Sequence, residues 1–548
     1  MFSYSEKMFD QVYVGVDVGT GSVRAACVSS EGNILHHQTV PITVHNPAEH
    51  FYEQASQEVW QAVCHAVQNV CGELKEDQKV AGIGFDATCS LVVLDEQDQP
   101  LTIDQHTGED KWNIVMWMDH RAAEEAEVIN QNPHSVLQYV GGKVSLEMQT
   151  PKLLWLKRHL PDTWTKAGHF LDLPDFLTFR ATGNATRSLC SLVCKWTYDG
   201  KKHSWDSKFL SDIGLEDLTR DDFRKIGSIV LPPGSVCGHV TAEAAQQLGV
   251  PQGTPVASSL IDAHAGALSL LTASREGPAG TLAVISGTSS CHLICSESRH
   301  DVPGVWGPYY GALLPGQWLA EAGQSATGAL CDHVINTHPA ANAALCNSKR
   351  AECVEALVYQ LAESRGLSDP TTLTRSLHVY PDHHGNRSPL ADPNMSGMVS
   401  GLTLSAGPDD LALTYLATVQ ALAYGTRHIV EQLRSSGHVI RSVMLCGGLA
   451  QSKLFTQTHA DVLGVDVVVP QQQQLSVVRG AALLGAAAAA PGDLYTAFAS
   501  FTANACSVTA PQRNHRRFHD LKYEVFKKMQ ADQLQYRVIM GQLSVSEA

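Results

Sequence analysis

A strand–turn–strand unit occurs twice in the sequence, and the two copies lie about half a chain length apart. The first spans residues 12–30 and turns at GTGS (19–22), and the second spans residues 280–298 and turns at GTSS (287–290). The two turns are separated by 268 positions in a chain of 548 residues. Because a repeated pattern indicates repeated structural units, the sequence predicts two related domains with a ligand site between them.

Strand and helix patterns alternate around these two units. Three β-branched runs within 12–44 are joined by short turns and predict a β-meander. Apolar residues at helical spacing predict helices over 54–71, 410–436 and 477–490. Strands that run into Gly- or Asp-bearing turns are expected at 80–88, 253–266 and 439–452. This alternation predicts an α/β fold, in which ligands bind at the carboxyl ends of the strands.

Composition and charge exclude several classes of protein. Lys and Arg number 39 against 55 Asp and Glu, so a surface built to bind nucleic acid is not expected. Charged residues make up only 17% of the chain, which favours large folded cores over disorder. No apolar run is long enough to span a membrane, and residues 1–11 show no signal peptide. We therefore expect a cytoplasmic protein whose cysteines are reduced.

Two cysteine pairs suggest zinc binding and one glycine pattern suggests dinucleotide binding, but the sequence favours neither interpretation. Cys190 and Cys194 (SLCSLVCKW), like Cys291 and Cys295 (SSCHLICSES), lie in apolar, β-rich segments without a second ligand pair at zinc-finger spacing. Buried structural cysteines are expected there. The GIGFDA segment at 82–87 matches the loose dinucleotide-binding pattern, but another strand follows it instead of a helix. A Walker A motif is absent from the sequence.

Two aspartates at the ends of expected strands are candidates for chemistry. Asp17 precedes the 19–22 turn, where glycine amides and two hydroxyls can bind phosphate oxygens, and its carboxylate could hold Mg²⁺ through water. An ordinary hairpin turn is the alternative. Asp262 lies in LIDAHAG, where it either caps a helix or accepts a proton from a hydroxyl group that attacks phosphorus.

Several separated motifs, taken together and in order, resemble those of the FGGY family of carbohydrate kinases. They are DVGTGSVR (17–24), WMDHRA (117–122), PKLLWLK (151–157), LIDAHAG (260–266), SGTSS (286–290), EAGQSATG (321–328), GNRSPLADPNMSG (385–397), GMVSGL (397–402) and CGGLAQS (446–452). The resemblance runs over about 12–490 and implies two actin-like (ribonuclease H-like) domains that flank a catalytic cleft. We expect a sugar-binding domain over 1–265 and a nucleotide-binding domain over 266–548.

The resemblance also implies roles for individual residues. Asp262 matches the catalytic base, and Asp17 and Asp262 would hold Mg²⁺, through water. Residues expected to contact ATP are Gly19, Thr20, Gly21, Ser22, Arg24, Gly287, Thr288, Gly447, Gly448 and Ser452.

The segments FDATCS, CSLVCKW and EAGQSA resemble the ribulokinase branch, which implies that Asp86, Lys195 and Glu321 bind the sugar. The alternatives are a solvated strand charge for Lys195 and a surface salt bridge for Glu321. The Trp117–Arg121 segment has a purely structural alternative, in which an arginine–carboxylate pair beside a tryptophan fixes a loop.

We therefore expect an ATP- and Mg²⁺-dependent kinase that converts D-ribulose to D-ribulose 5-phosphate. L-Ribulose, xylulose or a heptulose are alternative substrates, and a nucleotide-gated binding module of the actin-like class is an alternative without kinase activity. The expected partners are the sugar and ATP, with neither nucleic acid nor membrane, and a homodimer is left open. The segment after Pro511 predicts a terminal helix docked on the second domain.

Overall fold

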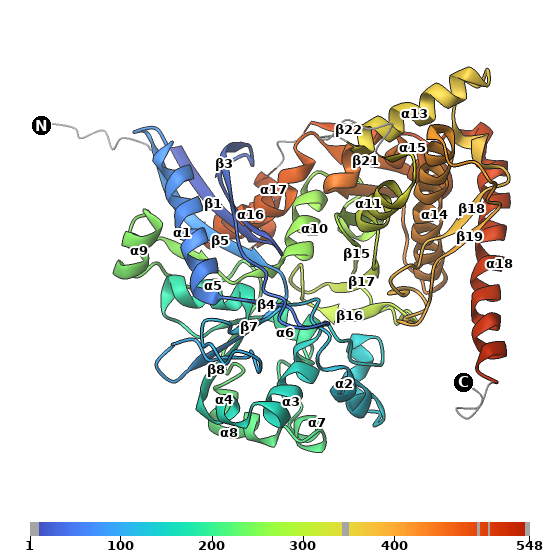
Figure 1. Ribbon diagram of the computed structural model, residues 1–548. Helices are drawn as coiled ribbons and strands as arrows, with labels where there is room; N and C mark the ends of the chain where they lie inside the picture. Colours follow the sequence, from blue (N-terminus) through green and yellow to red (C-terminus); the bar gives the residue numbers. More distant parts are fainter. Residues whose placement is uncertain (1–9, 342–349, 490–493, 502–504, 543–548) are drawn as a thin grey trace, which may run out of the picture.

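A computed structural model describes residues 10–341, 350–489, 494–501 and 505–542. Residues 1–9, where no signal peptide is expected, lie outside the described residues, as does Ala490 at the end of the last apolar helix pattern. The described part of the chain contains two large mixed sheets, with helices packed around and between them (Figure 1).

The first sheet begins with the expected meander. Its strands, in spatial order, are β11 (Val236–His239), β12 (Pro255–Ala257), β5 (Gln78–Ala87), β1 (Asp10–Val18), β2 (Ser22–Ser29) and β3 (Ile34–Pro41). β1, β2 and β3 pair antiparallel, whereas β5 pairs parallel with β1 and β12 pairs parallel with β5. A short strand, β13 (Leu260–Ile261), also pairs parallel with β5.

The alternating side chains of β1 enter two different cores. Val12, Val14, Val16 and Val18 pack with helix α1 (Ser56–Gly72) on one face of the sheet. Tyr13 belongs to the core that includes helix α16 (Ser476–Ala489) on the other face. Since successive side chains of a strand point to opposite faces, a strand covered by helices on both faces is apolar throughout.

The second sheet repeats the topology of the first. Its strands, in spatial order, are β16 (Trp306–Tyr310), β17 (Trp318–Gln324), β15 (Ser290–Ser296), β14 (Thr281–Ser286), β20 (Ser442–Cys446), β21 (Asp466–Pro470) and β22 (Cys506–Thr509). β14, β15 and β17 form an antiparallel meander, and β14, β20 and β21 run parallel. The repeat predicted from the two turns is therefore confirmed at the level of sheet topology.

Two helices pack against each other between the sheets (Figure 1). α10 (Asp262–Thr272) contacts β14 and β20 of the second sheet, and α16 contacts β1, β5 and β12 of the first. A helix from the second half of the chain thus covers the sheet of the first half. The boundary expected between residues 265 and 266 stays a prediction.

The remaining elements surround these two layers. A four-stranded sheet lies below the first one and consists of β4 (Glu53–Gln54), β7 (Ile114–Val115), β6 (Leu91–Asp95) and β8 (Ala167–Asp172). Two-stranded sheets are formed by β9 (Arg187–Ser188) with β10 (Val230–Leu231), and by β18 (His378–Tyr380) with β19 (Met398–Ser400). The outer helices include α2 (Ala123–Asn130), α3 (Gln149–His159), α4 (Pro161–Lys166), α5 (Leu173–Thr182), α6 (Leu189–Lys195), α7 (Ser207–Asp212), α9 (Ala242–Leu248), α11 (Gly328–Thr337), α13 (Arg350–Ser364), α14 (Pro408–Ser435), α15 (Lys453–Leu463), α17 (Leu494–Ser500) and α18 (Arg516–Met540).

The segment around Cys190 and Cys194 is a helix, so the expectation of a β-rich run there was wrong. The hydroxyl of Ser188 accepts a hydrogen bond from the N–H of Cys190 and caps α6, whose residues are all buried. A helix that is buried on every side has apolar residues all round, as a buried strand does, so composition cannot distinguish the two. The apolar residues around Cys190 and Cys194 therefore predicted a strand. The expected terminal helix is confirmed as α18, which packs on α14, α15 and β18. Among the described helices, none has the length and apolar character needed to cross a membrane.

Candidate active site

Three aspartates meet at the carboxyl ends of neighbouring strands in the first sheet. Asp17 of β1 lies directly opposite Asp86 of β5 in the parallel register. Asp262 follows β13, which pairs with the end of β5, and is the first residue of α10. Asp86 is fully buried and Asp17 almost so, whereas Asp262 is partly exposed. We call these three residues the aspartate group.

The aspartate group carries more negative charge than its protein surroundings neutralise. Burial raises the pKa of Asp86 well above its usual range, and the carboxylates of Asp17 and Asp262 raise it further. Burial also raises the pKa of Asp17, although Arg24 lies 3.2 Å away and opposes the shift. Burial and then Asp17 raise the pKa of Asp262 to about 7, against the opposing N–H of Ala263.

The donor atoms of the aspartate group suit a hard cation such as Mg²⁺. Neither carboxylate oxygen of Asp86 has a hydrogen-bond partner among the described residues, although both are buried. Buried polar atoms are normally satisfied, so these oxygens indicate a missing positive partner or a shared proton. Carboxylate oxygens are the ligands that Mg²⁺ prefers.

The first glycine turn is a tight hairpin with open space above it. The N–H of Gly19 donates to the carbonyl of Ser22 (2.9 Å), and a Cβ atom added to Gly21 would meet nothing within 4 Å in the described structure. The indole N–H of Trp117 donates to the hydroxyl of Thr20 (3.0 Å). Trp117, for which a purely structural role was the alternative, therefore supports this turn directly. Arg24 contacts the aspartate group and the carbonyl of Gln474.

The second glycine turn is held by a neighbouring motif. The N–H of Gly328 donates to the carbonyl of Gly287 (3.1 Å), and a Cβ on Gly328 would lie 2.6 Å from that oxygen. This close approach explains the glycine that ends EAGQSATG. Gly447 has φ +94° and follows β20, which pairs with β14, so the 287–288 turn and the 447–448 loop lie at the same sheet edge. Ser452 caps α15 through the N–H of Phe455.

Lys195 and Glu321 form the centre of a buried cluster of four ions. The Nζ atom of Lys195 lies 3.9 Å from Glu321 Oε1 and 3.9 Å from Glu147 Oε2. Arg387 donates to Glu147 Oε1 (2.7 Å). Lys195 also lies over the ring of Trp306, 4.5 Å from its centroid. We call Glu147, Lys195, Glu321 and Arg387 the ion cluster.

Lys195 and Glu321, at the centre of the ion cluster, are nearly inaccessible to water, and this rules out the alternative interpretation of each residue. Lys195 is 2% exposed and Glu321 is 3% exposed, so neither is a solvated charge or a surface salt bridge. Burial alone would lower the pKa of Lys195, but Glu321 and the other acidic groups nearby raise it overall. The pKa of Arg387 is likewise raised, by Glu147 above all, against the effect of burial. Both cations therefore stay charged.

The aspartate group and the ion cluster lie within electrostatic range of each other. Lys195 lowers the pKa of Asp262 and Glu321 raises it, each less than burial and Asp17 do. Asp262, the partly exposed carboxylate of the candidate cation site, is thus the member that also interacts with the ion cluster.

The sequence identified only half of the ion cluster. Arg387 could have been found as a candidate, because it lies in the GNRSPLADPNMSG motif, but no role was expected for it. Nothing in the sequence marked Glu147 or Trp306 as functional residues, because both lie outside the quoted motifs. Arg121 fits the structural alternative: its buried guanidinium lies 2.7 Å from Asp119 and 2.8 Å from Glu53.

Comparison with known proteins identifies the family. The FGGY family of carbohydrate kinases matches over its N-terminal domain at residues 12–269 and over its C-terminal domain at residues 282–489. An FGGY carbohydrate kinase domain-containing protein of Homo sapiens is 48% identical, over 98% of this chain and 100% of its own. A D-ribulokinase of Saccharomyces cerevisiae is 39% identical, over 88% of this chain and 72% of its own.

A solved structure has the same fold. A xylulose kinase from Rhodospirillum rubrum superposes with a TM-score of 0.79 at 21% identity, over 96% of this chain and 99% of its own. Together with the repeated sheet topology, this likeness confirms the expected pair of actin-like domains. The family matches make the protein a phosphotransferase with a hydroxyl acceptor and set aside the nucleotide-gated binding module. The chain belongs to the FGGY family of carbohydrate kinases.

Proposed function

We propose that this enzyme transfers the γ-phosphoryl group of ATP to O5 of D-ribulose, giving D-ribulose 5-phosphate and ADP. The observation that carries the proposal is that Asp262, the partly exposed member of the aspartate group, lies within electrostatic range of both Asp17 and the ion cluster and has a raised pKa. Similarity to the yeast D-ribulokinase supports the choice of sugar and a place in the ribulokinase-like branch. The fold alone leaves the sugar open, since a xylulose kinase shares it.

In the proposed reaction, Asp262 accepts the proton of the sugar O5 hydroxyl. The oxygen then forms the new bond to the γ-phosphorus while the bond between that phosphorus and the bridging oxygen of ADP breaks. Lys195 donates to hydroxyl or carbonyl oxygens of the sugar and Glu321 accepts from its hydroxyls, which orients O5 toward Asp262. Asp86 would assist by contacting the sugar or by sharing a proton with Asp17.

The nucleotide would bind mainly through backbone amides. The 19–22 and 287–288 turns would contact the β- and γ-phosphates, with Arg24 beside the first turn, and Gly447, Gly448 and Ser452 would lie by the adenosine. Asp17 and Asp262 would hold Mg²⁺ through water, and the bound ion supplies positive charge that neutralises the phosphate oxygens. Such a site needs few basic side chains, so an acidic protein can bind ATP.

A panel of ketoses assayed with the purified protein tests this proposal. ADP release would be measured with D-ribulose, L-ribulose, D-xylulose, L-xylulose and a heptulose, each with ATP and Mg²⁺, and the phosphorylated carbon would be assigned by NMR. We expect D-ribulose to give the highest kcat/KM and a 5-phosphate. A tenfold preference for another sugar would overturn the substrate assignment, and ATP turnover that ignores every sugar would overturn the kinase itself.

A further inference from the structure

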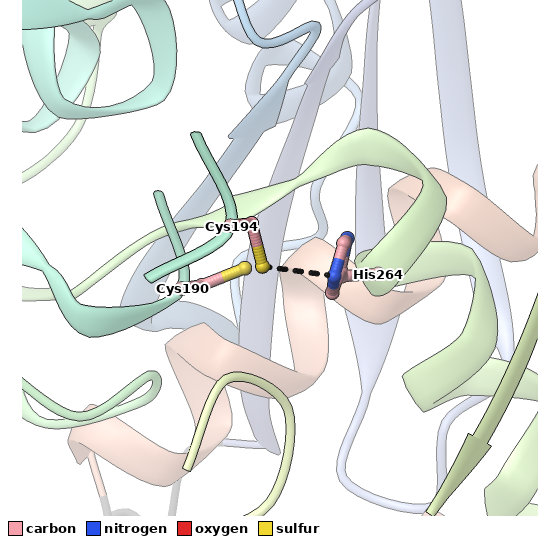
Figure 2. A group of neighbouring side chains, drawn as sticks. All are labelled: Cys190, Cys194 and His264. Atoms are coloured by element: carbon pink, nitrogen blue, oxygen red, sulfur yellow. Dashed lines mark hydrogen bonds between the residues drawn. The ribbon is translucent and has the colours of Figure 1, made fainter. Parts of the chain in front are cut away.

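The side chains of two cysteines and one histidine, all possible metal ligands, point toward one another (Figure 2). Cys190 and Cys194 are four residues apart in α6 and therefore lie on one helix face, and His264 comes from α10. All three side chains are fully buried. Cys194 Sγ lies 3.5 Å from His264 Nε2, and the three ligand atoms all lie within 4.8 Å of one another. No sequence spacing could reveal this group, because the histidine lies 70 residues from the nearer cysteine.

The geometry and chemistry of these ligands fit a zinc-like cation. In tetrahedral sites the ion lies about 2.3 Å from sulfur and about 2.0 Å from nitrogen, which places the two ligand atoms roughly 3.5 Å apart. Cys194 and His264 already have that separation.

Glu321 lies next to these three ligands but belongs to the ion cluster. Its Oε2 atom lies 3.7 Å from His264 Nε2 and has no hydrogen-bond partner in the described part of the chain. Its other oxygen faces Lys195. Two thiolates compensate the charge of a divalent ion completely. Such compensation is required for buried charge.

We propose that Cys190, Cys194 and His264 bind a thiophilic d¹⁰ cation, Zn²⁺, with water in the fourth position. The two cysteine thiols lose their protons to solvent when the ion binds. This site differs in kind from the aspartate group, which offers only oxygen atoms and suits Mg²⁺. The ion would tie α6 to α10 beside the ion cluster.

Cobalt substitution tests the proposal without reference to kinase activity. The full-length protein would be expressed in medium containing Co²⁺, so that the ion is present while the chain folds, and then purified without chelators. We expect one equivalent of Co²⁺ per chain and a thiolate-to-cobalt charge-transfer band. The variants Cys194→Ser and His264→Gln should lower the Co²⁺ content more than about tenfold. Cys331→Ser, which removes another buried helical thiol from α11, should bind Co²⁺ like the wild type.

The wild-type spectrum alone can decide against the site. A folded wild-type protein without a thiolate-to-cobalt band overturns the proposal even if a variant fails to fold. Equal Co²⁺ binding by the wild type and both folded ligand variants overturns it as well. Because neither readout involves sugar or ATP, failure here leaves the proposed kinase function untouched.

Discussion

At the scale of single residues, the charged side chains of the candidate site form two groups that differ in charge balance. The aspartate group has three carboxylates, and Arg24 is the one cation that forms an ion pair with it among the described residues. The ion cluster balances two carboxylates with two cations. Because buried charge without a partner is costly, the aspartate group requires a cation from outside the protein. The ion cluster is already balanced, so its donors and acceptors can form hydrogen bonds with a neutral polyol. This contrast supports Mg²⁺ and ATP at one group and the sugar at the other.

Replacing Asp262 by Asn should leave the fold intact and remove the general base. We expect kcat with D-ribulose to fall by about 10²–10⁴-fold, the usual contribution of such a group, while the melting temperature stays close to that of the wild type. Asp466→Asn, an exposed change at the start of β21, is the matched control. Turnover of the Asp262 variant within tenfold of the wild type would contradict the assignment.

The same residue predicts a pH dependence for the wild type. The raised pKa of Asp262, about 7, means that the carboxylate is protonated at lower pH and can no longer accept the hydroxyl proton. We therefore expect kcat/KM for the sugar to fall as the pH decreases through about 7, measured in the wild type. A profile that stays flat from pH 8 to pH 5.5 would argue against a base with this pKa.

Replacing Lys195 by Met should damage both binding and stability. The change leaves the buried carboxylate of Glu321 without its ammonium partner, and the loss of one partner of a buried ion pair typically costs about 3–5 kcal/mol. We expect the KM for the sugar to rise at least tenfold and the urea midpoint to fall. Lys202→Met removes an exposed lysine and should change neither quantity. An unchanged KM in a folded Lys195 variant would remove this residue from the sugar site.

At the scale of elements, close packing of α16 on the first sheet requires glycines in the strands. A Cβ on Gly84 would lie 2.0 Å from the carbonyl oxygen of Ala481, and one on Gly82 would lie 2.1 Å from that of Gly485. The glycine pair that matched a loose dinucleotide pattern thus serves helix–sheet packing. β6 follows β5, as the rejection of that pattern assumed.

Gly84→Ala tests this contact. Because the clash is with backbone atoms, α16 must move, and overpacking of this kind costs typically about 1–3 kcal/mol. We expect a lower free energy of unfolding in urea and weaker activity, since α16 also packs against α10, which begins at Asp262. Gly72→Ala at the end of α1 meets no atom within 4 Å and should change stability by less than about 1 kcal/mol. Equal stability of the two variants would contradict the packing argument.

Helices and strands whose apolar residues recur at a regular spacing could be predicted from the sequence, whereas fully buried elements without such a spacing could not. The valines of β1 and the apolar stripe of α14 identified their structures because each packs with a regular spacing. α6 did not, because all of its residues are buried and no polar face marks the helix. The contact between Glu147 and Arg387 joins residues 240 positions apart, so only the folded chain reveals it.

At the scale of the whole molecule, the two repeated sheets hold the site between them. The aspartate group lies on strand ends of the first sheet and at the start of α10, whereas Glu321 belongs to the second sheet. Lys195–Glu321 and Glu147–Arg387 are ion pairs between the two halves of the chain. With Lys195 and Glu321 at 2% and 3% exposure, a sugar cannot reach them in this arrangement. The two halves must therefore separate before the sugar binds.

Small-angle X-ray scattering measures this separation directly. We expect the radius of gyration of the ligand-free protein to decrease when D-ribulose and a non-hydrolysable ATP analogue are added together, because closure re-forms the ion pairs around the sugar and excludes water from the phosphoryl acceptor site. Arg387→Met removes the ion pair with Glu147 and should weaken this compaction, whereas Arg375→Met, at an exposed position outside the ion cluster, should not. Identical scattering of the wild type with and without both ligands would show that the sugar enters without domain opening, and the proposed roles of Lys195 and Glu321 would then fail.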